Sequence, residues 1–237
     1  MPAESKPPKG VSGRVRQIIR PPHRAIGEYA ASLGYKDLIY LNMGEPDFPS
    51  PPHVIEAARR AMEEGFTHYT SERGLPELRE AIANKLRERG VEASADGVII
   101  TCGAAEALFA TILCLVDPGD EVVLPDPYYP PYMSATLLAS GKPTLIPLNE
   151  QLEWSHEAIK ERVTDRAKLI IVNSPNNPTG GVFGDGTLKA ILDAAEEAGA
   201  YILSDEVYEF FTYDGADAPS IAKYCLLYTS PSPRDRG

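Results

Sequence analysis

Short apolar runs alternate with helical periodicity over the second half of the chain. The runs are rich in valine, isoleucine and leucine and span residues 97–101, 120–127, 167–175 and 200–208. Helical patterns separate them, as in residues 105–116 and in residues 187–199, where Gly199 is placed to end the helix. Buried strands separated by helices are typical of a parallel sheet covered on both faces. The pattern therefore predicts an α/β fold, a three-layer α/β/α sandwich with a mostly parallel sheet.

The first half of the chain predicts fewer strands. The segment up to Arg24 is rich in proline, lysine and arginine and predicts an extended arm. The run that begins at Leu38 predicts a short strand. Two helices follow, and Pro76 suits the first turn of the second one. The first helix carries its apolar residues on one face, namely Val54, Ala57, Ala58, Ala61 and Met62.

Composition narrows the class of protein. A chain of 237 residues with 43% hydrophobic and 24% charged residues is typical of a soluble globular protein. The net charge of -11 argues against nucleic acid and against an anionic membrane as partners. Cys102, Cys114 and Cys225 lack the spacing of metal ligands, so we expect no metal site. Three cysteines cannot all pair, so we expect a reducing, cytoplasmic location.

The unusual chemistry lies after the predicted strands, where ligands bind in open α/β sheets. After the first strand, Gly103, Ala104 and Ala105 open a helix whose N-terminus can hold a phosphate, although a tight turn needs small residues anyway. After the second strand, Tyr128, Tyr129 and Tyr132 lie among prolines. A tyrosine ring there can stack on a planar ligand or simply cover loop surface.

The third and fourth strand ends carry amides and acids. Residues 173–180, "NSPNNPTG", offer amide donors on a loop stiffened by two prolines. Asp205 ends an apolar strand, where a carboxylate is costly unless a cation meets it, whereas Glu206 is read as part of a surface turn. Asn177-Pro178 and Asp126-Pro127 are candidate cis bonds.

In this order, the four strand ends resemble those of the class I/II aminotransferases, pyridoxal-phosphate enzymes of fold type I. Residues 44–48, "GEPDF", and residues 68–83 are similar to N-terminal signatures of the same family. The resemblance extends over about residues 15–222. It implies an N-terminal arm and part of the small domain, then a partial cofactor-binding large domain, then a tail outside the family, at residues 1–48, 49–224 and 225–237.

The resemblance implies pyridoxal 5'-phosphate as cofactor, and a role for each matching residue. Asp205 matches the acid that pairs with the pyridine nitrogen, and Tyr129 matches the aromatic residue that stacks on the ring. Asn177 and Tyr208 match residues that hydrogen-bond the cofactor's 3-oxygen. The turn of Gly103, Ala104 and Ala105 matches the phosphate-binding turn.

Two further matches concern the substrate and a second subunit. Gly44, together with Asn177, matches residues near the carboxylate of the substrate. Tyr69 matches a tyrosine that reaches the phosphate of the neighbouring subunit. The resemblance therefore implies a homodimer.

The sequence departs from the family pattern after Asp205. The Schiff-base lysine of the family is absent: Lys223 is the sole lysine that follows, 18 positions on, and it lacks the serine-lysine context. Residues 225–237 do not continue the family sequence. We expect this chain to be the N-terminal portion of a longer enzyme, truncated before the lysine and ended by an artefactual tail.

Three functions fit these motifs. The first is transfer of an amino group between an L-amino acid and a 2-oxo acid by the intact parent enzyme, with this chain inactive as given. The second is a β-elimination lyase or an enzyme like the aminocyclopropane-carboxylate synthases, which share the motifs. The third is a non-catalytic fragment that retains affinity for the phosphate.

Overall fold

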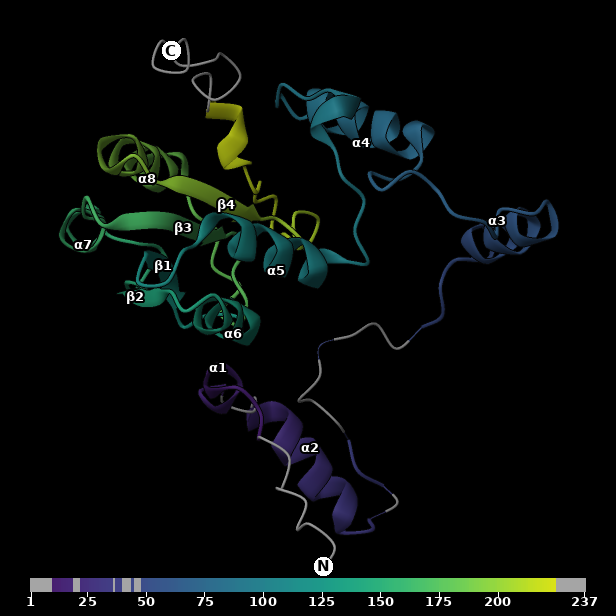
Figure 1. The fold of residues 1–237 in the computed structure, drawn as a ribbon, viewed down its shortest axis with the longest axis horizontal. Helices are drawn as coiled ribbons and strands as arrows, with labels where there is room; N and C mark the ends of the chain where they lie inside the picture. Colours follow the sequence, from purple (N-terminus) through teal and green to yellow (C-terminus); the bar gives the residue numbers. More distant parts are fainter. Residues whose placement is uncertain (1–9, 19–21, 36, 40–43, 45–47, 225–237) are drawn as a thin grey trace, which may run out of the picture. The chain divides into compact units, whose positions relative to one another are not determined.

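The computed structural model describes residues 10–18, 22–35, 37–39, 44 and 48–224 (Figure 1). The chain divides into two compact units. The sheet unit consists of Met1–Ile18 and Pro76–Gly237, and the N-terminal helical unit is Ile19–Leu75. Among the described residues, no helix is both long and apolar enough to cross a membrane.

The sheet unit is built on four parallel strands in the order β2-β1-β3-β4. The strands are β1 (Glu121–Asp126), β2 (Lys142–Pro147), β3 (Ala167–Asn173) and β4 (Tyr201–Asp205). In the register, the last residue of β3, Asn173, lies opposite the last residue of β4, Asp205. The carboxyl ends of the strands therefore meet at one edge of the sheet.

The helices of this unit are α1 (Gly13–Arg16), α4 (Pro76–Glu88), α5 (Ala104–Leu115), α6 (Pro130–Leu138), α7 (His156–Arg162) and α8 (Asp185–Ala198), with the 3-10 helices η1 (Ala95–Gly97) and η2 (Ile221–Tyr224). Successive residues of β3 enter different cores, as the alternation of a strand requires. Leu169 and Ile171 pack with residues of α5 and α6, whereas Ile170 and Val172 pack with residues of α7 and α8. The predicted layers of helix, sheet and helix are confirmed.

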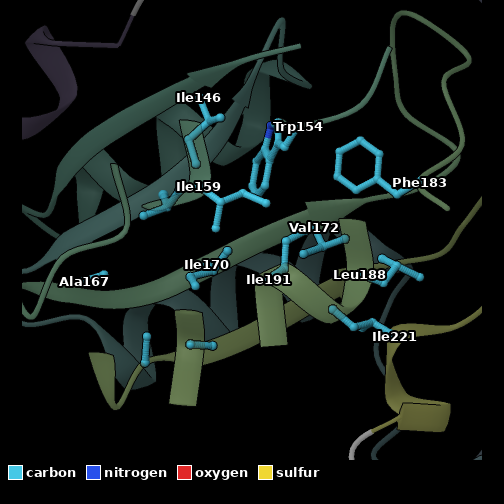
Figure 2. Packing of buried hydrophobic residues seen from close by; sticks show 13 residues of the cluster. Ile146, Trp154, Ile159, Ala167, Ile170, Val172, Phe183, Leu188, Ile191 and Ile221 are labelled. Atoms are coloured by element: carbon cyan, nitrogen blue, oxygen red, sulfur yellow. The ribbon is translucent and has the colours of Figure 1, made fainter. Parts of the chain in front are cut away.

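The core on the α7 and α8 side is centred on large buried side chains (Figure 2). Trp154 and Phe183 are both almost fully buried, and their ring centroids are 5.5 Å apart. Leu188 and Ile191 come from α8 and face β3. Gly199 ends α8 at φ 66°, which confirms the predicted stop.

One strand prediction is wrong, and one strand was missed. Residues 97–101 form no strand, because no described strand pairs with them, and Ile99 is 64% exposed. The strand β2 was not predicted, since its sequence "KPTLIP" carries two prolines and a charge; it forms because β1 offers a full parallel edge.

The N-terminal helical unit contains α2 (Pro22–Ser32) and α3 (Pro52–Glu63). The prediction of an extended arm up to Arg24 is wrong where α1 and α2 form. A helix can begin with proline, as α2, α3 and α4 do, so a proline-rich segment need not be extended. Residues 40–43 of the strand predicted from Leu38 lie outside the described residues.

Candidate functional site

A cavity of about 120 Å³ lies at the carboxyl ends of β3 and β4. It is bounded by the start of α5, the start of α6, the loop after β3 and the residues after β4. Of the predicted site residues, the cavity brings together Ala104, Ala105, Tyr129, Asn177, Asp205 and Tyr208. These come from four separate stretches of the sequence, which the parallel topology alone brings to one edge.

Asp205 is the buried acid of this cavity, with 8% of its surface exposed. Its Oδ2 accepts a hydrogen bond from the Tyr132 hydroxyl at 2.7 Å, and its Oδ1 accepts one from the Val207 backbone N–H at 3.2 Å. Both donors are neutral, and within the described part of the chain Asp205 forms no ion pair. A buried carboxylate without a counter-charge is costly, so the site favours a cationic group in the cavity.

The loop after β3 is held by the side chain of Asn173, which is buried. Its Nδ2 donates to the carbonyl oxygens of Asp205, at 3.1 Å, and of Pro175, at 3.2 Å. Its Oδ1 accepts the backbone N–H of Asn177 at 2.8 Å. One amide therefore ties the loop to the end of β4 and sets the position of Asn177.

Asn177 reaches the other side of the cavity, where its Nδ2 lies 3.4 Å from the Tyr208 hydroxyl, to which it donates. The peptide bonds Asn177-Pro178 and Asp126-Pro127 are cis, as predicted. Ser174-Pro175 is also cis, which the sequence reasoning missed. Two polar groups, an amide and a phenol, thus face the same space as Asp205.

The aromatic wall of the cavity consists of Tyr129 and Tyr132. Their rings meet edge to face, with centroids 5.5 Å apart and planes at 80°. Tyr128 packs against the core on the α5 and α6 side and does not line the cavity. A planar ligand beside Asp205 would therefore meet the ring of Tyr129, the tyrosine that the resemblance selects.

Tyr132 is the residue that sequence reasoning did not assign to the site. It lies in the first turn of α6, it is fully buried, and it contacts Asp205 directly. Burial raises the pKa of the Tyr132 phenol well above its usual range, and the negative charge of Asp205 raises it further. The only signal for it was its spacing of three residues from Tyr129, which places both residues at the start of one helix.

The first turn of α5 closes the cavity on another side. Gly103 caps the helix at φ 82°, a backbone conformation that residues with a Cβ rarely adopt. Ala104 and Ala105 line the cavity and carry no bulky side chain into it. A helix N-terminus with small residues is suited to an anion such as a phosphate.

Two predicted site residues, and the lysine that the sequence analysis set aside, lie elsewhere. Gly44 and Tyr69 belong to the N-terminal helical unit, and their contacts with substrate and with a second subunit stay predictions. Lys223 lies in η2, with its ammonium 4.9 Å from the ring centroid of Tyr224. Among the described residues that line the cavity there is no lysine, so Lys223 has no part in it.

Comparison with known proteins identifies the family. Residues 36–232 match the family "Aminotransferase class I and II". The chain belongs to this family. Its enzymes use pyridoxal 5'-phosphate, so the resemblance read from the sequence is confirmed.

The aminotransferase relatives are clearly similar in sequence. A probable aspartate aminotransferase of Methanocaldococcus jannaschii is 47% identical over 184 residues, which are 77% of this chain and 49% of that protein. A probable aspartate/prephenate aminotransferase of Aquifex aeolicus is 41% identical over 91% of this chain and 56% of its own length. The chain thus spans about half the length of the curated relatives it matches.

Solved aminotransferase structures share the fold. An alanine aminotransferase from Pyrococcus furiosus has a TM-score of 0.85 at 36% identity, over 91% of this chain and 56% of that one. An aspartate aminotransferase from Thermus thermophilus with maleate has a TM-score of 0.85 at 38% identity, over 91% and 57%. The α/β fold of this aminotransferase chain is therefore that of fold type I.

The residues of the cavity fit the cofactor of the family. Pyridoxal 5'-phosphate combines a basic ring nitrogen, a planar aromatic ring and a phosphate. The cavity offers a buried carboxylate that lacks a counter-charge among the described residues, an aromatic side chain and a helix N-terminus lined by the small residues Ala104 and Ala105. Each part of the cofactor has a complementary group at this edge of the sheet.

Proposed function

We propose that the whole protein transfers an amino group between an L-amino acid and a 2-oxo acid, with pyridoxal 5'-phosphate held at the strand ends. The observation that carries the proposal is Asp205, buried with two neutral donors beside a cavity lined by Tyr129 and Asn177. For the 237-residue chain itself, we propose only that it binds the cofactor.

Asp205 is assigned to the ring nitrogen of the cofactor. Its negative charge keeps that nitrogen protonated, since an opposite charge nearby favours the charged form. When bound, the cofactor supplies a protonated ring that withdraws electrons from the reacting carbon of the amino acid. Tyr129 lines the same cavity and would stack on the ring, which would hold the ring nitrogen toward the carboxylate.

The remaining groups of the cavity are assigned to the two ends of the cofactor. Gly103, Ala104 and Ala105 offer the N-terminus of α5 to the phosphate. The amide of Asn177 and the phenol of Tyr208 lie side by side and are assigned to the 3-oxygen. Both are neutral donors, suited to an oxygen that carries negative charge.

We extend the proposal to the substrates of the protein, its oligomeric state and its location in the cell. The relatives are named for aspartate, prephenate and aromatic amino acids, and one solved structure for alanine. These names support an L-amino acid and its 2-oxo acid as the substrate pair, with Gly44 and Asn177 near the substrate carboxylate. We also propose a homodimer in which Tyr69 serves the neighbouring site, and a cytoplasmic location.

The test is substitution of the acid. Equilibrium dialysis with pyridoxal 5'-phosphate is expected to show binding by the unchanged chain and about 100-fold weaker binding by Asp205→Asn, because a buried cation would lose its counter-charge. Asp193→Asn, on the exposed face of α8, is the matched control and is expected to bind normally. Equal affinity of the chain and of Asp205→Asn would refute the assignment.

A further inference from the structure

Tyr132 and Asp205 form a buried hydrogen bond between two elements that are far apart in the sequence. The hydroxyl of Tyr132, in α6, donates to Oδ2 of Asp205, at the end of β4, over 2.7 Å. Tyr132 is fully buried, and Asp205 is nearly so. The bond is therefore largely shielded from bulk water, and it reaches the one acid among the described residues that line the cavity.

We propose that Tyr132 is a positioning residue that holds the Asp205 carboxylate in the orientation in which it meets the cofactor's ring nitrogen. This inference rests on the proposed function. Tyr132 holds Oδ2 and the backbone of Val207 holds Oδ1, so the carboxylate cannot turn about its Cβ–Cγ bond without breaking both hydrogen bonds. A preoriented charge pays no reorganisation cost when the ligand arrives.

The chemical type of the donor matters as much as its position. A lysine or arginine in place of Tyr132 would neutralise Asp205 and remove its attraction for a protonated ring nitrogen. A phenol orients the carboxylate and leaves its charge available. Burial and the charge of Asp205 keep the phenol protonated, so it remains a donor over the whole physiological pH range.

Tyr132 is itself held in place by its neighbours. Its carbonyl accepts a hydrogen bond from the Thr136 hydroxyl at 2.8 Å, and its ring packs edge to face against Tyr129. Tyr132 therefore contacts both Asp205 and Tyr129, the two residues that are assigned to the ring of the cofactor. Tyr132 sets the spacing between these two groups.

The first experiment compares two hydroxyl deletions. Tyr132→Phe is expected to bind pyridoxal 5'-phosphate about 10- to 100-fold more weakly than the unchanged chain, as loss of a hydrogen bond to a charged group implies. Tyr128→Phe is the control, because no described group bonds its hydroxyl and it lies outside the cavity. It is expected to bind within about twofold of the unchanged chain.

Two further readouts separate positioning from a structural role. The ¹⁵N shift of ring-labelled pyridoxal 5'-phosphate reports protonation of the ring nitrogen in bound molecules only, so a loss of folded chain does not move it. We expect the protonated value in the unchanged chain and a shift toward the unprotonated value in Tyr132→Phe. In the Asp205→Asn background, Tyr132→Phe is expected to change affinity by less than about twofold, because the charge it orients is gone.

The outcomes are distinct. Absence of binding by the unchanged chain would refute the proposed function, and this inference with it. Binding by the unchanged chain, with the same affinity and the same ¹⁵N shift in Tyr132→Phe, would overturn this inference alone. Additive losses of affinity in the double variant would also overturn it, since they would show that Tyr132 does not act through Asp205.

Discussion

The helices α8 and α3 share an amphipathic pattern of residues, but only α8 buries its apolar face. Both are amphipathic, and both were predicted from the spacing of their apolar residues. α8 buries Leu188 and Ile191 against the sheet, whereas no residue of α3 is buried and Ile55 is 53% exposed. Periodicity thus determines that a helix forms and which face is apolar, but a neighbouring surface is needed to bury that face.

The described side-chain contacts within α3 are exposed ion pairs. Arg59 pairs with Glu56, at 2.6 Å, and with Glu63 one turn further on. The hydrogen bond from Arg59 lowers the pKa of Glu56. Exposed pairs of this kind contribute little to stability, so we expect substitutions in α3 and in α8 to have very different costs.

The largest difference is expected for the buried face of α8. Ile191→Ala removes a fully buried side chain between α8 and β3, and should lower the free energy of unfolding by about 2–5 kcal/mol. Urea denaturation followed by circular dichroism measures this loss. A loss below about 1 kcal/mol would mean that α8 does not pack on the sheet as described.

A smaller effect is expected at the end of α8. Gly199→Ala places a Cβ at φ 66°, with no atom within 4 Å of it, so the cost is that of the backbone alone, about 1–2 kcal/mol. Gly186→Ala, in the same helix and also in open space, is the matched control. It should be neutral or stabilising by about 0.4–1 kcal/mol. Equal effects in the two variants would show that Gly199 does not end the helix in a left-handed conformation.

The smallest effect is expected in α3. Ile55→Ala makes the same chemical change as Ile191→Ala but at a half-exposed position, and should change the free energy of unfolding by less than about 0.5 kcal/mol. The same urea titration applies. A cost similar to that of Ile191→Ala would mean that the apolar face of α3 is buried in solution, and would remove the contrast between the two helices.

The strands show where sequence reasoning succeeds and where it fails. The strands β1, β3 and β4 were predicted because each contains a short apolar run; β1 and β3 are largely buried, whereas β4 is only partly buried. Residues 97–101 have the same composition but form no strand, whereas "KPTLIP" forms β2 against the expected preference. Strand formation depends on a partner, and a window of sequence does not contain the partner.

Some residues of the candidate site could be predicted from the sequence and others could not. Asp205 and Asn177 are unusual residues after apolar strands, so they could be found from the sequence and from family resemblance. Tyr132 was one of three tyrosines among the prolines after the second predicted strand, and nothing in the sequence singles it out as the one that bonds Asp205. Its role depends on the end of β4 lying beside the start of α6.

The sequence by itself determined the helices α3, α4, α5 and α8, three of the strands, the family and the acid of the site, because these depend on local periodicity and on rare residues at strand ends. The tertiary structure alone decided the strand order, the absence of burial in α3 and the hydrogen bond from Tyr132 to Asp205. These features are contacts between segments far apart in the chain. Such contacts depend on which surfaces meet, and no single segment carries that information.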